Sequence, residues 1–543
     1  MQELNPSQIA QRLHQLTEVS VALGDAHDTA ALLDRILRVA KAMTDADGGT
    51  LYRPSEDRTS LCFHISLNDT LGIYQGGNSG KPIDIAPVPL YDQDGNKNLA
   101  SVAAYAANCN QSVNIDDVYK AEEFNFSGMR SFDAAFGYHS QSFLTVPMTD
   151  HEGELVGVLQ LVNARDLATG TIRAFTQTDQ RFIEALAAQA AAALTKQLLV
   201  QQLENLLESL VNLINIGIDE KSPYTGRHCQ FVPELTMLLA EAVHQASDGP
   251  LADFRMTDAD RKELWLAGLL HDCGKITTPV HIVDKATKLE TIFDRIHLVD
   301  TRFEVLLRDC EIRSLREQLA PGAGPGDPRA AIEERLRAEQ AALRADRDFL
   351  RHANLGGEGM SPADQARVRR IGQRRWVGPD GSGQDFLSEN EILNLTVRFG
   401  TLTEAERKVI NNHIDVSVRM LESLPWPKHL KNVPEYAGGH HERVDGKGYP
   451  RGLTRDEMSV QARIMAIADI FEALTAADRP YKKGKLLSES LHILGKFALN
   501  GHIDPDLFDI FVRDKVYVEF ARRNMQAHQI DAVDESTIPG YRP

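Results

Sequence analysis

The stretch GLLHDCGKI, residues 268–276, decides what the second half of this chain can fold around. It sets His271 next to Asp272. Lys275 follows His271 by about one helical turn, so His271 and Lys275 are expected on one face of a helix. Gly274 leaves room for another segment to approach closely. A histidine nitrogen and a neighbouring carboxylate can bind one metal ion while the second carboxylate oxygen bridges to another, and the lysine can donate a proton or bind a phosphate.

Further residues of metal-binding types lie outward from this stretch, mostly on predicted helices. They are His228 in PYTGRH, His413 in VINNHIDVSVRML, His440 and His441 in AGGHHERVDGKGYPRGL, and Asp469 in QARIMAIADIFEALTAADRPYKKG. A histidine on a helical face is usually solvated or satisfied within a core. Five histidines and two aspartates in this combination, with two of the histidines adjacent, are improbable as chance and predict a metal centre.

A phosphodiester is a suitable substrate for such a centre. Its negative charge repels hydroxide, whereas two cations about 3.5–4 Å apart can bind its non-bridging oxygens and lower the pKa of a shared water. Imidazoles with a bridging carboxylate favour iron or manganese, with zinc possible, over magnesium in an all-oxygen site.

These strings resemble the HD-GYP family, a branch of the HD superfamily of metal-dependent phosphohydrolases. HDCGK corresponds to the HD motif and HHERVDGKGYP to the long signature that ends in Gly-Tyr-Pro. The resemblance covers residues 211–288 and 399–500. It implies an all-helical bundle with a dinuclear or trinuclear metal centre, and hydrolysis of the bacterial second messenger cyclic di-GMP to linear pGpG, GMP or both.

The resemblance also implies residue roles by motif position. The implied metal ligands are His228, His271, Asp272, His413, His440, His441 and Asp469, and the implied substrate contacts are Gly448, Tyr449, Pro450, Arg479 and Lys482. Asp272 would be the bridging carboxylate, and Lys275 would donate a proton to the leaving oxygen or contact a phosphate. Trinuclear members carry a glutamate where this chain has Tyr224, so two metal ions are favoured.

The separation of His271 from His413 is much longer than the family pattern and indicates an insertion at about 291–398. An amphipathic helix is predicted over 290–309, and the charge density of 330–354 predicts a solvated helix or an antiparallel hairpin arm; the breaker PGAGPGDP at 321–328 separates them. His297 is a rival ligand because it is nearer to His271 in sequence; His413 is preferred because it follows the helix start TLTEAE. The insertion either regulates access, or binds a partner, or is a passive elaboration.

The first part of the chain predicts a small α+β domain. Residues 1–45 are expected to be helical, with an N-terminal helix over 1–24 and a helical stripe of apolar residues in ALLDRILRVAKAMTDADGG (31–49). The strand-like runs GTLYRP, SFLTVPM (142–148) and GELVGVLQLVN (153–163) follow. Residues 25–195 resemble a GAF domain, an antiparallel sheet with helices. Three residues match a cyclic-nucleotide signature of some members while Ala164 and Gln180 depart from it; the matching residues are Asn163, Phe175 and Asp179. The favoured interpretation is a sensor or dimerisation module whose ligand is unknown or absent.

A long helix over 179–217 is predicted to connect this domain to the helical bundle. Its leucines recur with heptad spacing, at Leu199, Leu203, Leu206, Leu210 and Leu213. This seam favours a parallel two-stranded connector and hence a homodimer; the alternative is a single helix packed on one domain. The predicted fold is therefore an α+β GAF-like sensor (25–195) joined by a long helix to an all-α HD-GYP bundle (211–500), followed by a C-terminal helix and frayed tail (501–543).

Composition restricts the class of protein. The chain has 543 residues, and 59 Lys and Arg against 77 Asp and Glu give a net charge of −18, which disfavours a nucleic-acid polymer as partner. Local cations at the site still allow a small anionic substrate. The five cysteines form no CxxC pair and indicate reduced thiols. Neither a signal peptide nor an apolar run of membrane-spanning length is present, so a cytoplasmic protein without a membrane segment is expected.

Together these features predict a metal-dependent cyclic di-GMP phosphodiesterase regulated by a GAF domain. Two alternatives stay open: a catalytically inactive protein that binds cyclic di-GMP and signals through partners, and a phosphodiesterase for another cyclic nucleotide.

Overall fold

The computed structural model of the chain describes residues 29–319, 329–357, 359–477 and 484–543, without the side chains of 223–226. The chain divides into two compact units between Leu207 and Glu208. The helix expected over 1–24 lies outside the described residues. None of the helices in the described ranges combines the length and the apolar composition that a bilayer crossing requires.

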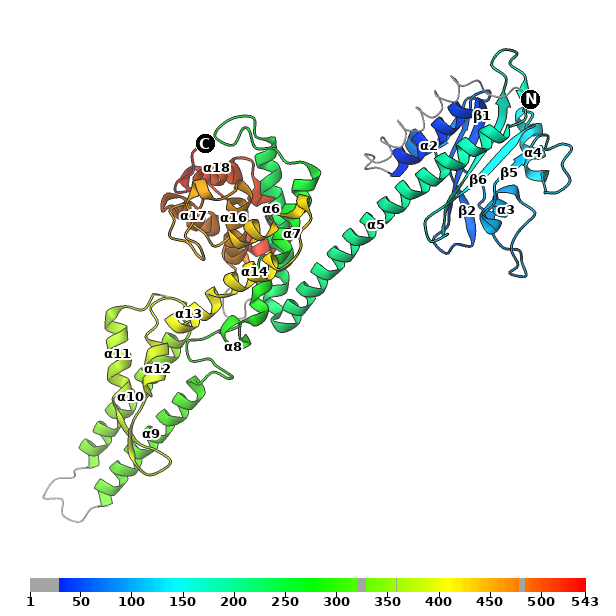
Figure 1. The fold of residues 1–543 in the computed structure, drawn as a ribbon. Coiled ribbons are helices and arrows are strands. Elements are labelled where there is room, and N and C mark those ends of the chain that lie inside the picture. Colours follow the sequence, from blue (N-terminus) through cyan, green and yellow to red (C-terminus); the bar gives the residue numbers. More distant parts are fainter. Residues whose placement is uncertain (1–28, 320–328, 358, 478–483) are drawn as a thin grey trace. The chain divides into compact units, whose positions relative to one another are not determined.

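The first unit is built on one antiparallel sheet with the strand order β3-β2-β1-β7-β6-β5, to which β4 and β8 add short pairings. The strands are β1 (Ala46–Pro54), β2 (Ser60–Asn68), β3 (Ile73–Gly76), β4 (Val88–Pro89), β5 (Val113–Ile115), β6 (Phe143–Thr149), β7 (Leu155–Arg165) and β8 (Ile172–Arg173). The helices of this part are α2 (Thr29–Thr44), η1 (Gly77–Ser79), α3 (Val102–Cys109), α4 (Ser127–Phe136) and α5 (Gln177–Lys221). The predicted helix–sheet–helix order is confirmed (Figure 1).

The core of this unit lies between the sheet and the helices α2 and α5. Ile36 and Leu37 of α2, Leu159 of β7 and Ile183 of α5 belong to one buried cluster. Their spacing follows the helical and strand periods that place apolar side chains on one face. Tyr52 and Val158 belong to a second cluster that includes residues of α3. The sheet is therefore covered on both faces, as a stable GAF-type fold requires.

The three residues that match the cyclic-nucleotide signature make contacts that stabilise the fold of this unit. Asn163 Oδ1 accepts a hydrogen bond of 2.7 Å from the Gln141 backbone N–H, and the Asn163 backbone has a φ of 58°. Asp179 accepts bonds from Arg173 (2.8 Å) and from the Thr176 backbone (2.9 Å) at the start of α5. Phe175 is buried in the main core. These contacts account for the residue types without a bound nucleotide, and the GAF ligand stays unknown.

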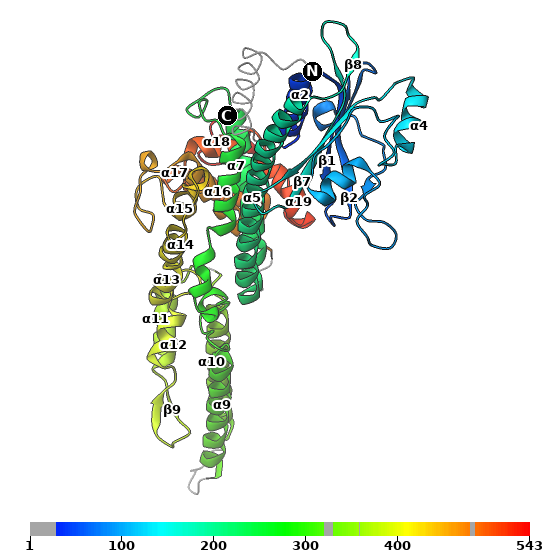
Figure 2. The ribbon, with the colours of Figure 1, turned by 45° about the vertical axis from the view of Figure 1, so that its right-hand side comes forward.

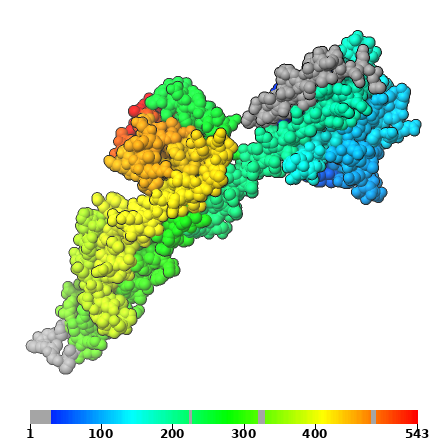
Figure 3. Space-filling view, in the orientation of Figure 1, coloured from blue at the N-terminus to red at the C-terminus, as the bar shows by residue number. Residues whose placement is uncertain are grey.

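The 45-residue helix α5 is continuous over the predicted connector. The seam leucines are exposed to solvent in the single chain: Leu199 50%, Leu203 64%, Leu206 65%, Leu210 46% and Leu213 63%. The stretch of α5 that carries them is visible at the surface in the space-filling view (Figure 3). The heptad spacing therefore does not reflect packing of these leucines within one chain.

The second unit is a helical bundle that carries the predicted site. Its elements outside the insertion are α6 (Pro223–Gln245), α7 (Asp258–Leu270), η2 (Cys273–Thr277), α8 (Val280–Val283), α13 (Glu404–Asn411), α14 (His413–Glu422), η3 (Lys428–Leu430), α15 (Val433–Gly438), η4 (Arg455–Glu457), α16 (Val460–Thr475), α17 (Leu487–Leu499), α18 (Pro505–Arg513), α19 (Val516–Asn524), η5 (Ala527–Gln529) and η6 (Glu535–Thr537). Helices α6 and α16 pack together at its centre. Val232, Leu235 and Leu239 of α6 are fully buried at helical spacing, as are Ile464 and Ile467 of α16.

The insertion folds around its own apolar core, which includes Phe303, Leu343 and Phe386. Its elements are α9 (Ile296–Leu319), α10 (Arg329–Asn354), α11 (Pro362–Gly372), β9 (Arg375–Val377), β10 (Gly383–Asp385) and α12 (Glu389–Leu395). Helices α9 and α10 lie side by side as an antiparallel hairpin (Figures 1 and 2). Ion pairs join them, with Arg351 on Asp300 (3.0 Å). The predicted pair of helices is confirmed, whereas the β-hairpin was not predicted.

Hydrogen bonds join the insertion to α13, the helix that precedes His413. The buried ammonium of Lys285 donates to Asn394 of α12 and to both carboxylate oxygens of Glu406 of α13, all at 2.8 Å. Helix α13 ends one residue before Asn412, and His413 begins α14. The insertion therefore bears on the position of His413 through a short chain of contacts.

The C-terminal part corrects the prediction of one helix and a frayed tail. It contains two helices, α18 and α19, and the segment after them is packed. Ile538 is 8% exposed, and Arg542 pairs with Asp509 at 2.7 Å. The buried amide of Gln529 donates to the backbone oxygens of Thr475 (2.8 Å) and Lys485 (3.1 Å). The tail has no regular apolar pattern, so its packing against distant residues could not be predicted from the sequence.

Candidate metal centre

Asp272 lies at the meeting point of the predicted ligands. Its Oδ2 atom lies 3.1 Å from His228 Nε2, 3.2 Å from His271 Nε2 and 2.5 Å from Lys275 Nζ. Its Oδ1 atom lies 3.1 Å from His413 Nε2. Asp272 is 1% exposed and His271 is fully buried. One carboxylate therefore faces nitrogens that α6, α14 and the HD motif supply.

The structure corrects the predicted placement of Lys275. Helix α7 ends at Leu270, and Lys275 lies on the 3-10 turn η2, so it does not share a helical face with His271. The tighter turn instead directs its ammonium to Asp272, three residues earlier.

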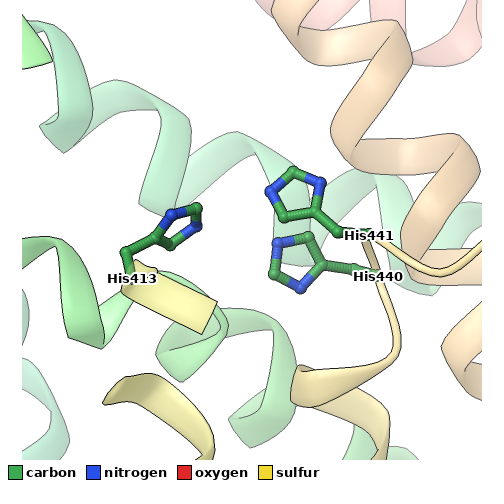
Figure 4. Close-up of side chains that lie close together, drawn as sticks. All are labelled: His413, His440 and His441. Carbon is green, nitrogen blue, oxygen red and sulfur yellow. The ribbon is translucent and has the colours of Figure 1, made fainter. Parts of the chain in front are cut away.

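The ligand atoms form two groups. His228, His271 and Asp272 make one, and His413, His440 and His441 make the other; within each group the ligand atoms all lie within 4.8 Å of one another. Figure 4 shows the His413 ring at the start of α14 opposite the rings of His440 and His441, which come from the segment after α15. Asp272 links the groups through its contact with His413. Asp469 of α16 adds an oxygen 3.1 Å from His228 Nε2.

Within the described part of the chain, three ligand atoms are buried without a hydrogen-bond partner: Asp272 Oδ1, His413 Nε2 and His440 Nε2. Leaving such atoms unsatisfied costs about 1–3 kcal/mol each. The His413 nitrogen and the Asp272 oxygen face each other at 3.1 Å, and two lone pairs at this distance repel. Two atoms about 3 Å apart can both bind one cation about 2.1 Å from each. The donor set therefore fits a metal centre.

Backbone carbonyls orient three of the imidazoles in the same way. The Nδ1 atoms of His271, His413 and His440 face the carbonyl oxygens three residues earlier, those of Gly268 (2.7 Å), Ile410 and Ala437 (2.6 Å). A carbonyl can only accept, so each Nδ1 carries the proton and each Nε2 keeps its lone pair toward the centre. The local helix geometry therefore sets the tautomer that a metal ligand needs.

Burial and neighbouring charges keep His440, His441 and Asp272 in the forms that bind cations. Burial lowers the pKa of His440 well below its usual range and that of His441 to about 4, so both rings are neutral. Burial alone would raise the pKa of Asp272. Lys275 and His271 outweigh that effect and hold the pKa well below its usual value, so this side chain remains a carboxylate. Burial would lower the pKa of Lys275, but Asp272 raises it above its ordinary value.

Glu472 is a functional side chain that the sequence motifs did not reveal. It is 3% exposed, and its Oε2 atom lies 2.5 Å from His228 Nδ1. Burial alone would lower the pKa of His228, but Glu472, Asp272 and Asp469 together raise it well above its usual value. The available signal was the spacing, because Glu472 lies one helical turn after Asp469 on α16. A carboxylate behind a ligand histidine orients the ring and increases its basicity.

Two glycines are required by close backbone approach. A Cβ atom on Gly274 would lie 2.0 Å from the His413 carbonyl oxygen, and one on Gly448 would lie 2.4 Å from the Arg443 nitrogen. Gly448 therefore shapes the turn. The buried carboxylate of Glu442 holds the same turn by accepting from the backbone N–H groups of Arg451 (2.7 Å) and Leu453 (2.9 Å).

An open pocket of about 430 Å³ adjoins the ligands. It is lined by His441, Arg443, Lys447, Tyr449, Asp469, Ile470, Ala473, Leu474 and His502. The Tyr449 ring stacks on His441, with centroids 4.9 Å apart, and Pro450 follows it through a cis peptide bond. Arg443, Lys447 and His502 were not predicted, although the first two lie inside the signature HHERVDGKGYP.

Arg479 and Lys482 are outside the described residues. His297 is exposed on α9 and belongs to neither ligand group, so the preference for His413 agrees with the geometry. All five cysteines are free.

Family models match the chain in three places. The GAF domain model matches residues 28–194, and two HD domain models match residues 225–346 and 389–507. The chain is therefore a GAF domain followed by a helical HD domain. Together with the signature that carries His440 and His441, its curated relatives place the HD domain in the HD-GYP type.

Three curated relatives are similar to part of the chain. A cyclic di-GMP phosphodiesterase of Pseudomonas aeruginosa is 39% identical over 21% of this chain and 26% of its own length. The 3'3'-cGAMP-specific phosphodiesterase 1 of Vibrio cholerae is 41% identical over 21% and 26%. The 3'3'-cGAMP-specific phosphodiesterase 3 of the same organism is 36% identical over 27% and 29%. The matches thus span less than a third of each relative.

Proposed function

We propose that this chain is a metal-dependent phosphodiesterase that hydrolyses cyclic di-GMP to linear pGpG and on to GMP, under regulation by its GAF domain. The observation that carries the proposal is that seven histidine and aspartate side chains converge around Asp272, with three of their ligand atoms buried and without a partner among the described residues. Similarity to a cyclic di-GMP phosphodiesterase supports the substrate class.

The centre is proposed to hold two metal ions, iron or manganese, with zinc as an alternative. The ligands are His228, His271, Asp272, His413, His440, His441 and Asp469. When bound, a pair of divalent cations supplies positive charge for the phosphate oxygens and a water of lowered pKa. Tyr224 stands where a third ion would need a carboxylate; its side chain is outside the described residues.

The chain's own residues supply the remaining chemistry. Asp272 holds the two ligand groups together, while the Lys275 ammonium, 2.5 Å from it, carries the proton for the leaving ribose oxygen. Tyr449 lines the pocket beside His441 and offers an aromatic face to a guanine. Gly448 and Pro450 shape this turn, and Arg479 and Lys482 are proposed to contact phosphate.

A second candidate substrate is 3'3'-cGAMP, because two of the relatives are specific for it. It has the same pair of phosphodiester bonds as cyclic di-GMP and differs in one base. Both substrates would use the same centre, so the geometry of the ligands does not choose between them.

The proposal is tested by loading the purified chain with Fe(II) or Mn(II), measuring metal content, and incubating it with each cyclic dinucleotide. We expect pGpG and then GMP by chromatography, and loss of turnover after chelation. Turnover of 3'3'-cGAMP alone would establish the second candidate. Tight binding of cyclic di-GMP with no product from either cyclic dinucleotide, at two metal ions per chain, would contradict both candidates and identify a binding protein.

We also propose that two chains associate through the α5 seam as a parallel coiled coil. Five leucines at heptad spacing expose about half or more of their surface, which is costly in water and is removed when a second seam covers them. The flanking residues Gln201 and Gln202 are polar and exposed, as a two-stranded seam requires. The partner is therefore a second copy of this chain.

Replacing Leu206 by glutamate is expected to convert the dimer to a monomer at micromolar concentration. The substitution places a charge at the seam residue with the largest exposed fraction, 65%, where the dimer would bury it. Sedimentation velocity measures the change, with Gln201→Glu as the matched control, because Gln201 is exposed on the face of α5 opposite the leucine seam. A wild-type chain that sediments as a monomer, or a Leu206→Glu chain that remains dimeric, would contradict the proposal.

A further inference from the structure

We infer that the pocket beside the candidate metal centre holds the nucleotide whose phosphodiester bond is not being cleaved, with Lys447 contacting its phosphate and His502 its base. The inference rests on the proposed function. A cyclic dinucleotide carries two phosphates on opposite sides of one ring. When one lies at the metal ligands, the other needs a second source of positive charge.

The pocket is lined both by candidate metal ligands and by two positively charged side chains. His441 and Asp469 line it from the metal side, and Arg443 and Lys447 line it together with His502. Its volume of about 430 Å³ is within the range of sites for small ligands. A substrate that reaches the metal ligands through this pocket therefore passes both cations.

The two cations differ in how firmly they are held. The Arg443 guanidinium makes two bonds with Asp445, of 3.1 and 2.8 Å. The Lys447 ammonium is 3.7 Å from Asp445, and its side chain is 78% exposed. Such a loose surface pair contributes little energy, so Lys447 can turn to a phosphate at small cost. Arg443 instead keeps Asp445 neutralised.

The position of Lys447 is nevertheless well defined by its backbone. Its N–H donates to Asp445 Oδ1 at 3.1 Å, and Gly446 before it has a φ of 74°, which favours glycine. The Asp445 N–H in turn donates to the Gly501 oxygen at 3.0 Å. The turn that carries Lys447 is thus braced against the turn that carries His502.

Other lining residues of the pocket suit a base. The His502 ring stacks on Phe497 with centroids 4.6 Å apart, and burial lowers the pKa of His502, so the ring is neutral. Ile470, Ala473 and Leu474 add apolar lining. Nucleobases stack on aromatic rings, including histidine, and on apolar surfaces. One rim residue therefore matches the phosphate and another matches the base.

The test compares two substrates with Lys447→Met and His502→Ala. Cyclic di-GMP has the second nucleotide, whereas bis(p-nitrophenyl) phosphate has one phosphodiester and neither a second phosphate nor a purine. For Lys447→Met we expect KM for cyclic di-GMP to rise about five- to tenfold at low salt, with kcat changed less than twofold. The difference should shrink at high salt, because ions screen an exposed charge.

The single-phosphodiester substrate should be hydrolysed equally by wild type and both variants. Lys447→Arg should restore most of the affinity, and Lys496→Met, an exposed lysine of α17 outside the pocket, is the control for general charge. An unchanged KM for cyclic di-GMP in Lys447→Met, or equal losses on both substrates, would overturn the inference.

Equilibrium binding of cyclic di-GMP separates this inference from the proposed function. If the wild type binds cyclic di-GMP without hydrolysing it, the proposed activity fails, and a five- to tenfold weaker Kd for Lys447→Met still supports the pocket. If Kd is the same for both proteins, the pocket assignment is wrong whatever the activity. Thermal melting of each variant confirms that the comparison is made on folded protein.

Discussion

Turnover of cyclic di-GMP by the Asp272→Asn variant is expected to fall by about 10³-fold or more. The amide has the same shape as the carboxylate but carries no charge. Asp272 is the group that contacts His228, His271, His413 and Lys275 at 2.5–3.2 Å. Without its charge the two ligand groups lose their common anion, and the Lys275 ammonium loses its partner.

Metal content measured on the same preparation shows why activity is lost. We expect it to fall from two ions per chain to one or fewer, because an amide cannot bridge two cations as a carboxylate does. Asp258→Asn is the matched control: Asp258 lies at the exposed start of α7, the helix that leads into the HD motif. An Asp272→Asn protein that keeps two metal ions and wild-type turnover would show that the bridging role is wrong.

Gly274→Ala is expected to reduce turnover by about 10²-fold and to lower the free energy of unfolding by about 3 kcal/mol. The added methyl group would lie 2.0 Å from the His413 oxygen and 2.6 Å from the Ser417 nitrogen, both of which belong to the backbone of α14. Backbone atoms cannot rotate aside as a side chain can. Helix α14 must therefore move away from the HD motif, and His413 moves with it.

Two measurements distinguish this displacement from general destabilisation. Denaturant unfolding gives the change in stability, and metal titration at a temperature where the variant is folded gives the affinity of the centre. Gly357→Ala is the control, since a Cβ atom there meets no atom within 4 Å. If Gly274→Ala binds metal and turns over substrate as the wild type does, the approach of α14 is not what positions His413.

Much of the fold followed from local patterns. Local patterns indicated the helices α9, α10 and α16, and short strand-like runs indicated β1, β6 and β7, because such patterns are properties of short segments. The candidate ligands were identifiable for a related reason. Each lies in a short motif of histidine or aspartate, and several such motifs in one chain indicate a metal centre because these polar residues seldom gather on apolar helices.

Features that depend on distant partners were not accessible in this way. Glu472 looked like any charged residue of α16 until its contact with His228 was seen, and Gln529 looked like part of a loose tail. Lys275 was expected one α-helical turn from His271, but α7 ends at Leu270 because the following turn is 3-10. The contacts of Glu472 and Gln529 were decided by packing against elements far away in sequence.

The sequence by itself determined which residue types are available: the imidazoles and carboxylates, the small residue between Cys273 and Lys275, and the leucine seam of α5. Only the tertiary structure decided how they meet. It places the His413 nitrogen and the Asp272 oxygen 3.1 Å apart without a hydrogen bond, and it surrounds the neighbouring pocket with Lys447 and His502. The physical reason is that residue chemistry is local, whereas distance, burial and unmet hydrogen bonds arise from segments brought together by folding.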